Sequence, residues 1–136
     1  MKNILFIDSD ESIRDDVRDY IERNGDAAQI QNLRVQILAS FADAEKIFDG
    51  EKVDGIIIDA IRPSSNNILP FIQKTRIKKS DLPIIALVGF IDMIVDEKLK
   101  RDLKNEQVQI VDKLEALANI TNLLQNCCGK NNGGDS

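Results

Sequence analysis

Residues 54–63 read Asp-Gly-Ile-Ile-Ile-Asp-Ala-Ile-Arg-Pro, and this stretch decides the fold. The three consecutive isoleucines are typical of a strand that is covered on both faces, as in a parallel sheet flanked by helices. Asp59 follows them, and open α/β sheets place their ligands at the carboxyl ends of their strands. The carboxylate of Asp59 can therefore be a phosphoryl acceptor, a metal ligand, a helix cap or a solvated loop group.

The rest of the chain repeats a strand followed by a helix. Short apolar runs predict strands, and apolar residues spaced three or four apart predict helices. The predicted strands cover residues 4–7, 35–39, 55–59, 83–89 and 108–111, and apolar positions within 13–21, 44–48, 68–75, 91–103 and 114–124 mark the helices. This order predicts an α/β fold, (βα)5, with a five-stranded parallel doubly wound sheet in a three-layer sandwich. We expect one domain over residues 1–128 and a disordered polar tail over residues 129–136.

Composition excludes several classes of function. The chain has 136 residues, 43% of them hydrophobic and 30% charged, which fits one globular domain. Its net charge of −5 does not suggest nucleic-acid binding, and the absence of histidine excludes Ser-His-Asp and histidine–metal sites. The first apolar run is too short for a membrane span or a signal peptide, and two adjacent cysteines do not suggest a disulfide. We therefore expect a cytoplasmic protein with no membrane contact and no organic cofactor.

Charged side chains follow three of the predicted strands: Asp8 follows the first, Asp59 the third and Lys113 the fifth. In a sheet of this type the three strand ends converge on one crevice. Two carboxylates repel each other there unless a cation lies between them, and either Mg²⁺ or the Lys113 ammonium can serve. A nucleophilic carboxylate, a metal and a further cation are also what phosphoryl transfer to aspartate requires.

This set of motifs resembles the receiver domain of two-component response regulators, the flavodoxin-like CheY type, over about residues 2–126. The matching motifs are Ile-Asp-Ser-Asp at 7–10, Ile-Ile-Ile-Asp at 56–59 with Pro63, and Lys113. The resemblance implies that Asp59 accepts a phosphoryl group, that Asp8 binds Mg²⁺ and that Lys113 contacts the phosphoryl group. It also implies a cytoplasmic signalling module that is not an enzyme. Its protein partner would be a histidine kinase or an output protein, docking on the face of the fourth and fifth helices.

The chain departs from the family pattern at four positions, one of which is Leu114 in place of the proline that follows the lysine. Ser9 stands where the family has a second acid, Val88 where it has a serine or threonine, and Ile110 where it has the switch aromatic. Losing a metal ligand and a phosphoryl donor costs several kcal/mol of transition-state stabilisation if each is worth ~2–4 kcal/mol. We therefore expect a weak Mg²⁺ site made by Asp8 and Asp59, with Asp10 as a candidate third ligand, and impaired or absent phosphorylation of Asp59.

Other interpretations stay open at this level. A functional phospho-accepting receiver would still use Asp59. A phosphatase of the haloacid-dehalogenase type would use Asp8 as nucleophile and Asp10 as acid/base, although the sequence lacks a later acidic pair and room for a cap domain. Asp8 and Asp10 can also be plain helix caps, and Lys113 can be a solvated lysine at the end of a strand.

Overall fold

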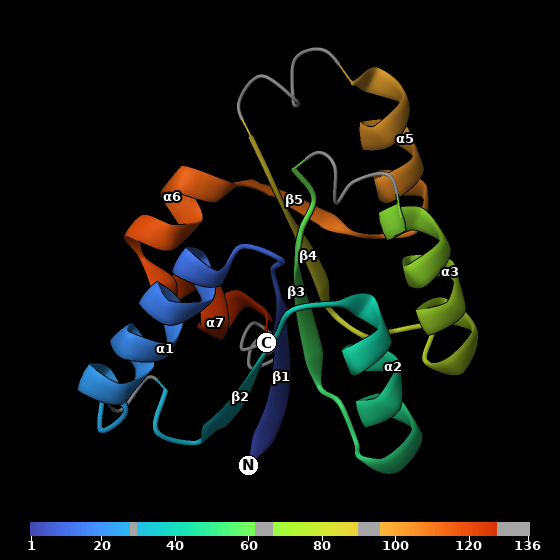
Figure 1. Cartoon of the computed structure of the whole chain (residues 1–136). Helices are drawn as coiled ribbons and strands as arrows, with labels where there is room; N and C mark the ends of the chain where they lie inside the picture. Colours follow the sequence, from blue (N-terminus) through green and yellow to red (C-terminus); the bar gives the residue numbers. More distant parts are fainter. Residues whose placement is uncertain (28–29, 62–66, 90–95, 128–136) are drawn as a thin grey trace, which may run out of the picture.

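The computed structural model describes residues 1–27, 30–61, 67–89 and 96–127. Its centre is a parallel five-stranded sheet in the order β2-β1-β3-β4-β5 (Figure 1). The strands are β1 (Lys2–Ile7), β2 (Leu33–Leu38), β3 (Gly55–Asp59), β4 (Ile84–Val88) and β5 (Gln109–Asp112). The predicted doubly wound α/β fold is confirmed, and β1 lies between β2 and β3 so that the ends of β1 and β3 are neighbours.

Helices cover both faces of the sheet, which makes three layers (Figure 1). One face carries α1 (Glu11–Asn24), α6 (Lys113–Ala118) and α7 (Ile120–Cys127), and the other carries α2 (Phe41–Gly50), α3 (Ile68–Lys78) and α5 (Glu97–Asn105). Among the described residues, none of these helices is long and apolar enough to cross a membrane.

The isoleucine run of β3 divides the core in two. Ile56 and Ile58 belong to the apolar cluster under α2 and α3, while Ile57 belongs to the cluster under α1 and α7. All three side chains are fully buried. Alternate side chains of one strand therefore hold both helical layers on the sheet, which is why the run is continuous and not alternating in polarity.

The last helix differs from the sequence prediction. A single helix over residues 114–124 was expected, but the structure contains α6 and α7 separated at Asn119, whose backbone leaves the helical conformation. The Asn119 side chain accepts a hydrogen bond from the Asn122 amide at 3.1 Å and so begins a new helix. Asparagine competes with the helical backbone in this way, and apolar spacing alone does not show it.

Two further boundaries also moved. α6 begins at Lys113 directly after β5, because the Asp112 side chain caps it by accepting from the Glu115 amide at 3.0 Å. The predicted helix over residues 91–103 is observed from Glu97, where Asp96 accepts from the Leu99 amide at 2.9 Å. The earlier part of that prediction, the tail at 129–136 and Pro63 lie outside the described residues.

Candidate functional site

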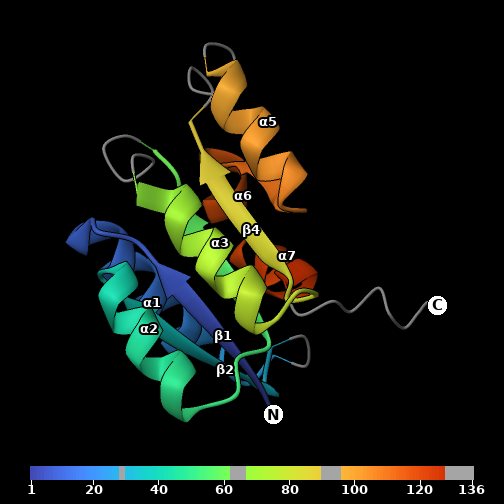
Figure 2. The ribbon, with the colours of Figure 1, turned by 90° about the vertical axis from the view of Figure 1, so that its right-hand side faces the viewer.

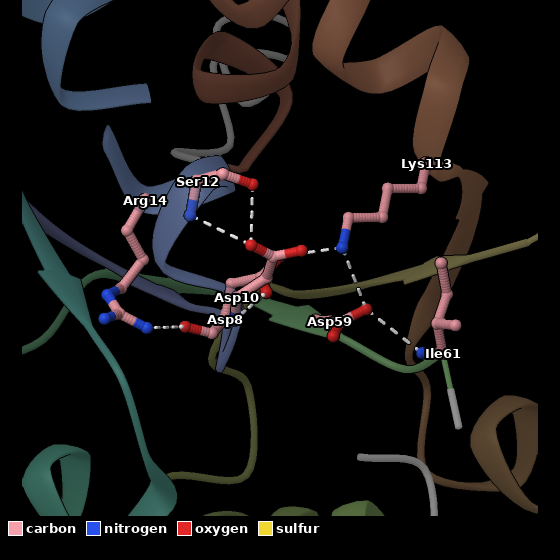
Figure 3. A network of polar contacts seen from close by, with 7 residues as sticks. All are labelled: Asp8, Asp10, Ser12, Arg14, Asp59, Ile61 and Lys113. Atoms are coloured by element: carbon pink, nitrogen blue, oxygen red, sulfur yellow. Dashed lines mark hydrogen bonds and ion pairs between the residues drawn. The ribbon is translucent and has the colours of Figure 1, made fainter. Parts of the chain in front are cut away.

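The structure brings Asp8, Asp59 and Lys113 together at the carboxyl edge of the sheet (Figure 3). The Lys113 ammonium nitrogen lies 2.8 Å from Asp8 Oδ2 and 3.2 Å from Asp59 Oδ1. All three residues are buried. The convergence expected from the sequence is therefore present, and the cation between the two carboxylates in this structure is Lys113.

Local backbone structure fixes each of these side chains. Asp8 directly follows β1, and its Oδ1 accepts from the Asp10 amide at 2.9 Å, while Arg14 donates to its carbonyl at 3.0 Å. Asp59 is the last residue of β3, and its Oδ1 also accepts from the Ile61 amide at 3.1 Å. Each carboxylate is thus oriented by an amide two residues further on, an Asx-turn arrangement common where a strand ends.

Burial and charge act on Asp59 and Lys113 in different ways. Burial raises the pKa of Asp59, and the neighbouring charge of Asp8 raises it further, against the Ile61 amide and the Lys113 charge. Burial pulls the pKa of Lys113 down, but its close ion pairs with Asp8 and Asp59 outweigh burial and raise that pKa. The Lys113 side chain therefore carries a charge, and repulsion from the Asp8 carboxylate contributes to the raised pKa of Asp59.

The cluster has the composition of a weak site for a divalent cation. Asp8 Oδ2 is buried and paired with the Lys113 charge, yet no well-aligned hydrogen bond from the described residues reaches it. It therefore keeps lone pairs suited to a hard cation. The described part of the chain contains no group of three acidic, histidine or cysteine side chains able to hold a metal. Two carboxylates fit Mg²⁺, which keeps several waters, but Lys113 competes for the same oxygens.

Asp10 has a different position from the other two acids. Its carboxylate turns to the start of α1, where Oδ1 accepts from the Ser12 amide at 2.9 Å and from the Ser12 hydroxyl at 2.7 Å (Figure 3). The hydroxyl and then the amide of Ser12 lower the pKa of Asp10. The helix-cap alternative is confirmed for Asp10, and a role for it as a third metal ligand stays a prediction.

A cavity of about 180 Å³ opens beside the two carboxylates. Its lining residues are Ile7, Asp8, Ser9, Ala39, Ser40, Phe41, Asp59 and Asn67. None of Ser40, Phe41 and Asn67 was predicted from the sequence as a site residue. Ser40 and Phe41 could have been found, because they follow β2, whose end lies beside that of β1 in this topology.

The substituted family positions lie in apolar surroundings. Val88 is the last residue of β4 and is buried in the cluster that contains Ile58 and Ala60. Ile110 on β5 packs against the same cluster. Neither side chain carries a hydrogen-bonding group, so the hydroxyl and the aromatic ring of the family pattern have no counterpart at these positions. Ser9, in the place of the second acid, lines the cavity.

The chain is an α/β protein with an acid–lysine cluster at the carboxyl edge of a parallel sheet. No family model and no curated protein sequence matches it. Solved structures do match. They include the non-phosphorylated receiver domain of HemR from Leptospira biflexa, at 18% identity with a TM-score of 0.69 over 95% of each chain.

Two other matches are of the same kind. The chemotaxis protein CheY4 of Vibrio cholerae has 19% identity and a TM-score of 0.69, over 93% of this chain and 98% of that one. The response regulator TrrA of Thermotoga maritima, solved with Mg²⁺ and BeF, has 20% identity and a TM-score of 0.64, over 93% of this chain and 98% of that one. The chain therefore has the fold of response-regulator receiver domains.

Proposed function

We propose that this chain is a receiver-type signalling module that acts by binding a protein partner and accepts phosphoryl groups poorly or not at all. The observation that carries this proposal is the buried Lys113 ammonium, which pairs with both Asp8 and Asp59. The receiver fold makes a signalling role the natural interpretation of the cluster. The expected partner is a histidine kinase or an output protein.

The residual chemistry of the site is that of phosphoryl transfer to Asp59. An oxygen of Asp59 would attack the phosphorus of a donor to form an acyl phosphate as the donor's leaving group departs. Asp8 and Asp59 would hold Mg²⁺, which supplies charge neutralisation at the phosphoryl oxygens. Lys113 would have to exchange part of its pairing with these carboxylates for a contact with the phosphoryl group.

Two substitutions weaken that chemistry. Ser9 supplies a neutral hydroxyl where a third carboxylate would strengthen metal binding, and Val88 supplies no donor to a phosphoryl oxygen. Each such loss costs ~2–4 kcal/mol of transition-state stabilisation, so their combination slows transfer by orders of magnitude. In the proposed function, Lys113 therefore keeps the site in the state in which its ammonium pairs with Asp8 and Asp59.

The surface expected to bind a partner is formed by the fourth and fifth helices, observed as α5 and the α6–α7 pair, which lie on opposite faces of the sheet beside its edge strand β5. Among the described residues, Leu114 on α6 is one of three large apolar side chains that are strongly exposed, at 81%. We propose this surface as the docking site for the partner.

Incubation with acetyl phosphate and Mg²⁺, followed by intact-mass measurement, tests the phosphoryl chemistry. We expect little or no modification of the native chain, and none of the Asp59→Asn variant. Ser9→Asp with Val88→Thr should raise the modified fraction by restoring a ligand and a donor. Rapid stoichiometric modification of the native chain at Asp59 would instead establish the functional receiver. Steady turnover of a phosphate ester would favour the phosphatase.

A further inference from the structure

We propose that two copies of this chain associate through the groove between α2 and α3, about a two-fold axis that runs along the groove. Association through this groove does not depend on phosphorylation of Asp59. Figure 2 faces the side of the molecule on which α2 and α3 lie next to each other. The groove has a volume of about 260 Å³ and is lined by Glu45, Phe48, Phe71, Lys74, Thr75, Ile77 and Lys78.

The floor and one rim of the groove are apolar. Phe48 and Phe71 form part of its lining, and Phe71 is held in place by stacking on Phe41, with ring centres 4.6 Å apart. Ile77 stands at the groove with 86% of its surface exposed. Ile77 and the neighbouring aromatic rings together expose apolar surface, and association with a second molecule would remove that surface from water.

The charges that pair across the groove are segregated by sign, with the acids on α2 and the lysines on α3. Lys74 of α3 pairs with Glu45 of α2 at 3.4 Å, and Lys78 pairs with Asp49 at 3.3 Å. The two pairs lie one helical turn apart, with both acids on α2 and both lysines on α3. These side chains are largely exposed, so they remain available to a second molecule.

This arrangement selects one symmetry. A two-fold axis along the groove places α2 of each copy opposite α3 of the other, so both acids face both lysines. An axis across the groove would instead place acids against acids and lysines against lysines. The first arrangement also brings Ile77 of the second copy over the aromatic floor near Phe48. The surface is thus complementary to itself in charge and in shape, as a two-fold interface requires.

The net charge of the whole chain favours this face over others. A chain of net charge −5 repels a copy of itself, and the repulsion is least where acids and bases balance. The α2 and α3 segments together carry the acids Asp43, Glu45 and Asp49 and the bases Lys46, Lys74, Arg76 and Lys78. The face around the groove is therefore not acidic, in contrast to the chain as a whole.

Sedimentation of the native chain over a range of concentrations tests the proposal. We expect the apparent mass to rise from that of a 15.2 kDa monomer towards a dimer. Ile77→Asp should weaken dimerisation roughly tenfold or more, because burying an unpaired charge replaces burial of an apolar side chain. Leu114→Asp is the comparison variant, because Leu114 is 81% exposed on α6, which lies on the opposite face of the sheet from the groove, so this change alters the proposed partner surface and not the groove. It should leave dimerisation unchanged.

Charge reversal tests whether the charges on α2 and α3 lie in the interface. Lys74→Glu with Lys78→Glu gives a groove with acids on both sides, and Glu45→Lys with Asp49→Lys gives one with lysines on both sides. Each double variant should be monomeric alone, with an unchanged circular dichroism spectrum, and a mixture of the two should form mixed dimers. Three results would each overturn the proposal. The native chain could stay monomeric at near-millimolar concentration, or the mixture of the two double variants could form no mixed dimer. The third is a loss of dimerisation in Leu114→Asp while Ile77→Asp still dimerises.

Discussion

Lys113 connects the two carboxylates of the candidate site. Its ammonium is the one charge in the described cluster that offsets Asp8 and Asp59, and all three groups are buried. Replacing it with methionine leaves two facing carboxylates without a counterion. We expect Lys113→Met to lower the free energy of unfolding by about 2 kcal/mol at neutral pH. This is below the usual cost of breaking a buried pair, because the cavity admits water to the cluster.

The control for this prediction is a double-mutant cycle measured by urea denaturation. Adding Asp59→Asn to Lys113→Met removes the repulsion between the carboxylates, so the double variant should be more stable than Lys113→Met alone. Strictly additive effects, or a Lys113→Met variant as stable as the native chain, would contradict the account of the cluster.

The raised pKa of Asp59 makes stability depend on pH. Burial first, and the charge of Asp8 second, raise this pKa above its ordinary value of 3.8. As pH rises from 3.8 through the higher folded-state value, the unfolded chain loses its proton first, and the folded state loses stability. Asp59→Asn cannot ionise, so its stability relative to the native chain should increase across that interval and stay constant above it. Unfolding midpoints of both proteins at a series of acidic pH values check this prediction. An increase in the stability of the native chain relative to Asp59→Asn as pH rises would refute it.

At the scale of elements, Arg76 of α3 joins two loops at the amino end of the sheet. Its guanidinium donates to the carbonyls of Leu82 at 2.6 Å, Glu106 at 2.9 Å and Gln107 at 3.2 Å. Gln107 has a φ of 60°, a left-handed conformation that side-chain-bearing residues adopt at a cost. Arg76 therefore helps to hold the strained turn between α5 and β5.

Arg76→Met should lower the free energy of unfolding by about 2 kcal/mol, because three carbonyls lose a charged donor. The comparison is Lys79→Met, since Lys79 makes a single longer bond, 3.4 Å, to the Val53 carbonyl. Chemical denaturation of both variants checks the prediction. An equal or larger loss in Lys79→Met would show that Arg76 does not have this role.

The cap of α1 allows a helix-cap role to be separated from a metal-ligand role. Asp10→Ser keeps an oxygen that can accept from the Ser12 amide but removes the carboxylate, whereas Asp10→Ala removes both. We expect Asp10→Ser to retain native thermal stability and the same weak Mg²⁺ affinity. Asp10→Ala should lower the thermal stability and leave the Mg²⁺ affinity unchanged. A fall in Mg²⁺ affinity in Asp10→Ser, measured by titration calorimetry, would make Asp10 a ligand.

The layers of the fold and the acid–lysine cluster could both be predicted from the sequence. The layers follow from the apolar runs of the strands, and the cluster follows from the polar residues at the strand ends. Continuous apolar runs at residues 56–58 and 84–88 determine the parallel sheet, and the topology then places Asp8, Asp59 and Lys113 at one edge. The sequence did not predict the break at Asn119, since that depends on one side chain capping a new helix. The direction of the Asp10 carboxylate was equally open, because a cap and a ligand require the same residue type.

At the scale of the whole molecule, the chain has a receiver fold with an acid–lysine cluster at the carboxyl edge of its sheet. Val88 lies in the core and Ile110 packs against it, and neither side chain carries a hydrogen-bonding group. The cavity beside Asp59 is still open, with Phe41 in its wall stacked on Phe71. Under the proposed function, the fold would present surfaces to partners while its phosphoryl chemistry is weak.

The most direct test is amide NMR of the native chain during a Mg²⁺ titration, followed by addition of beryllofluoride. The account predicts small shifts near Asp8, Asp59 and Lys113 that do not saturate, and no spread when beryllofluoride is added. Ser9→Asp with Val88→Thr, measured in parallel, should saturate and show wider changes. Saturating shifts in the native chain that spread across the domain with beryllofluoride would contradict the claim, and would establish that Asp59 operates a working switch.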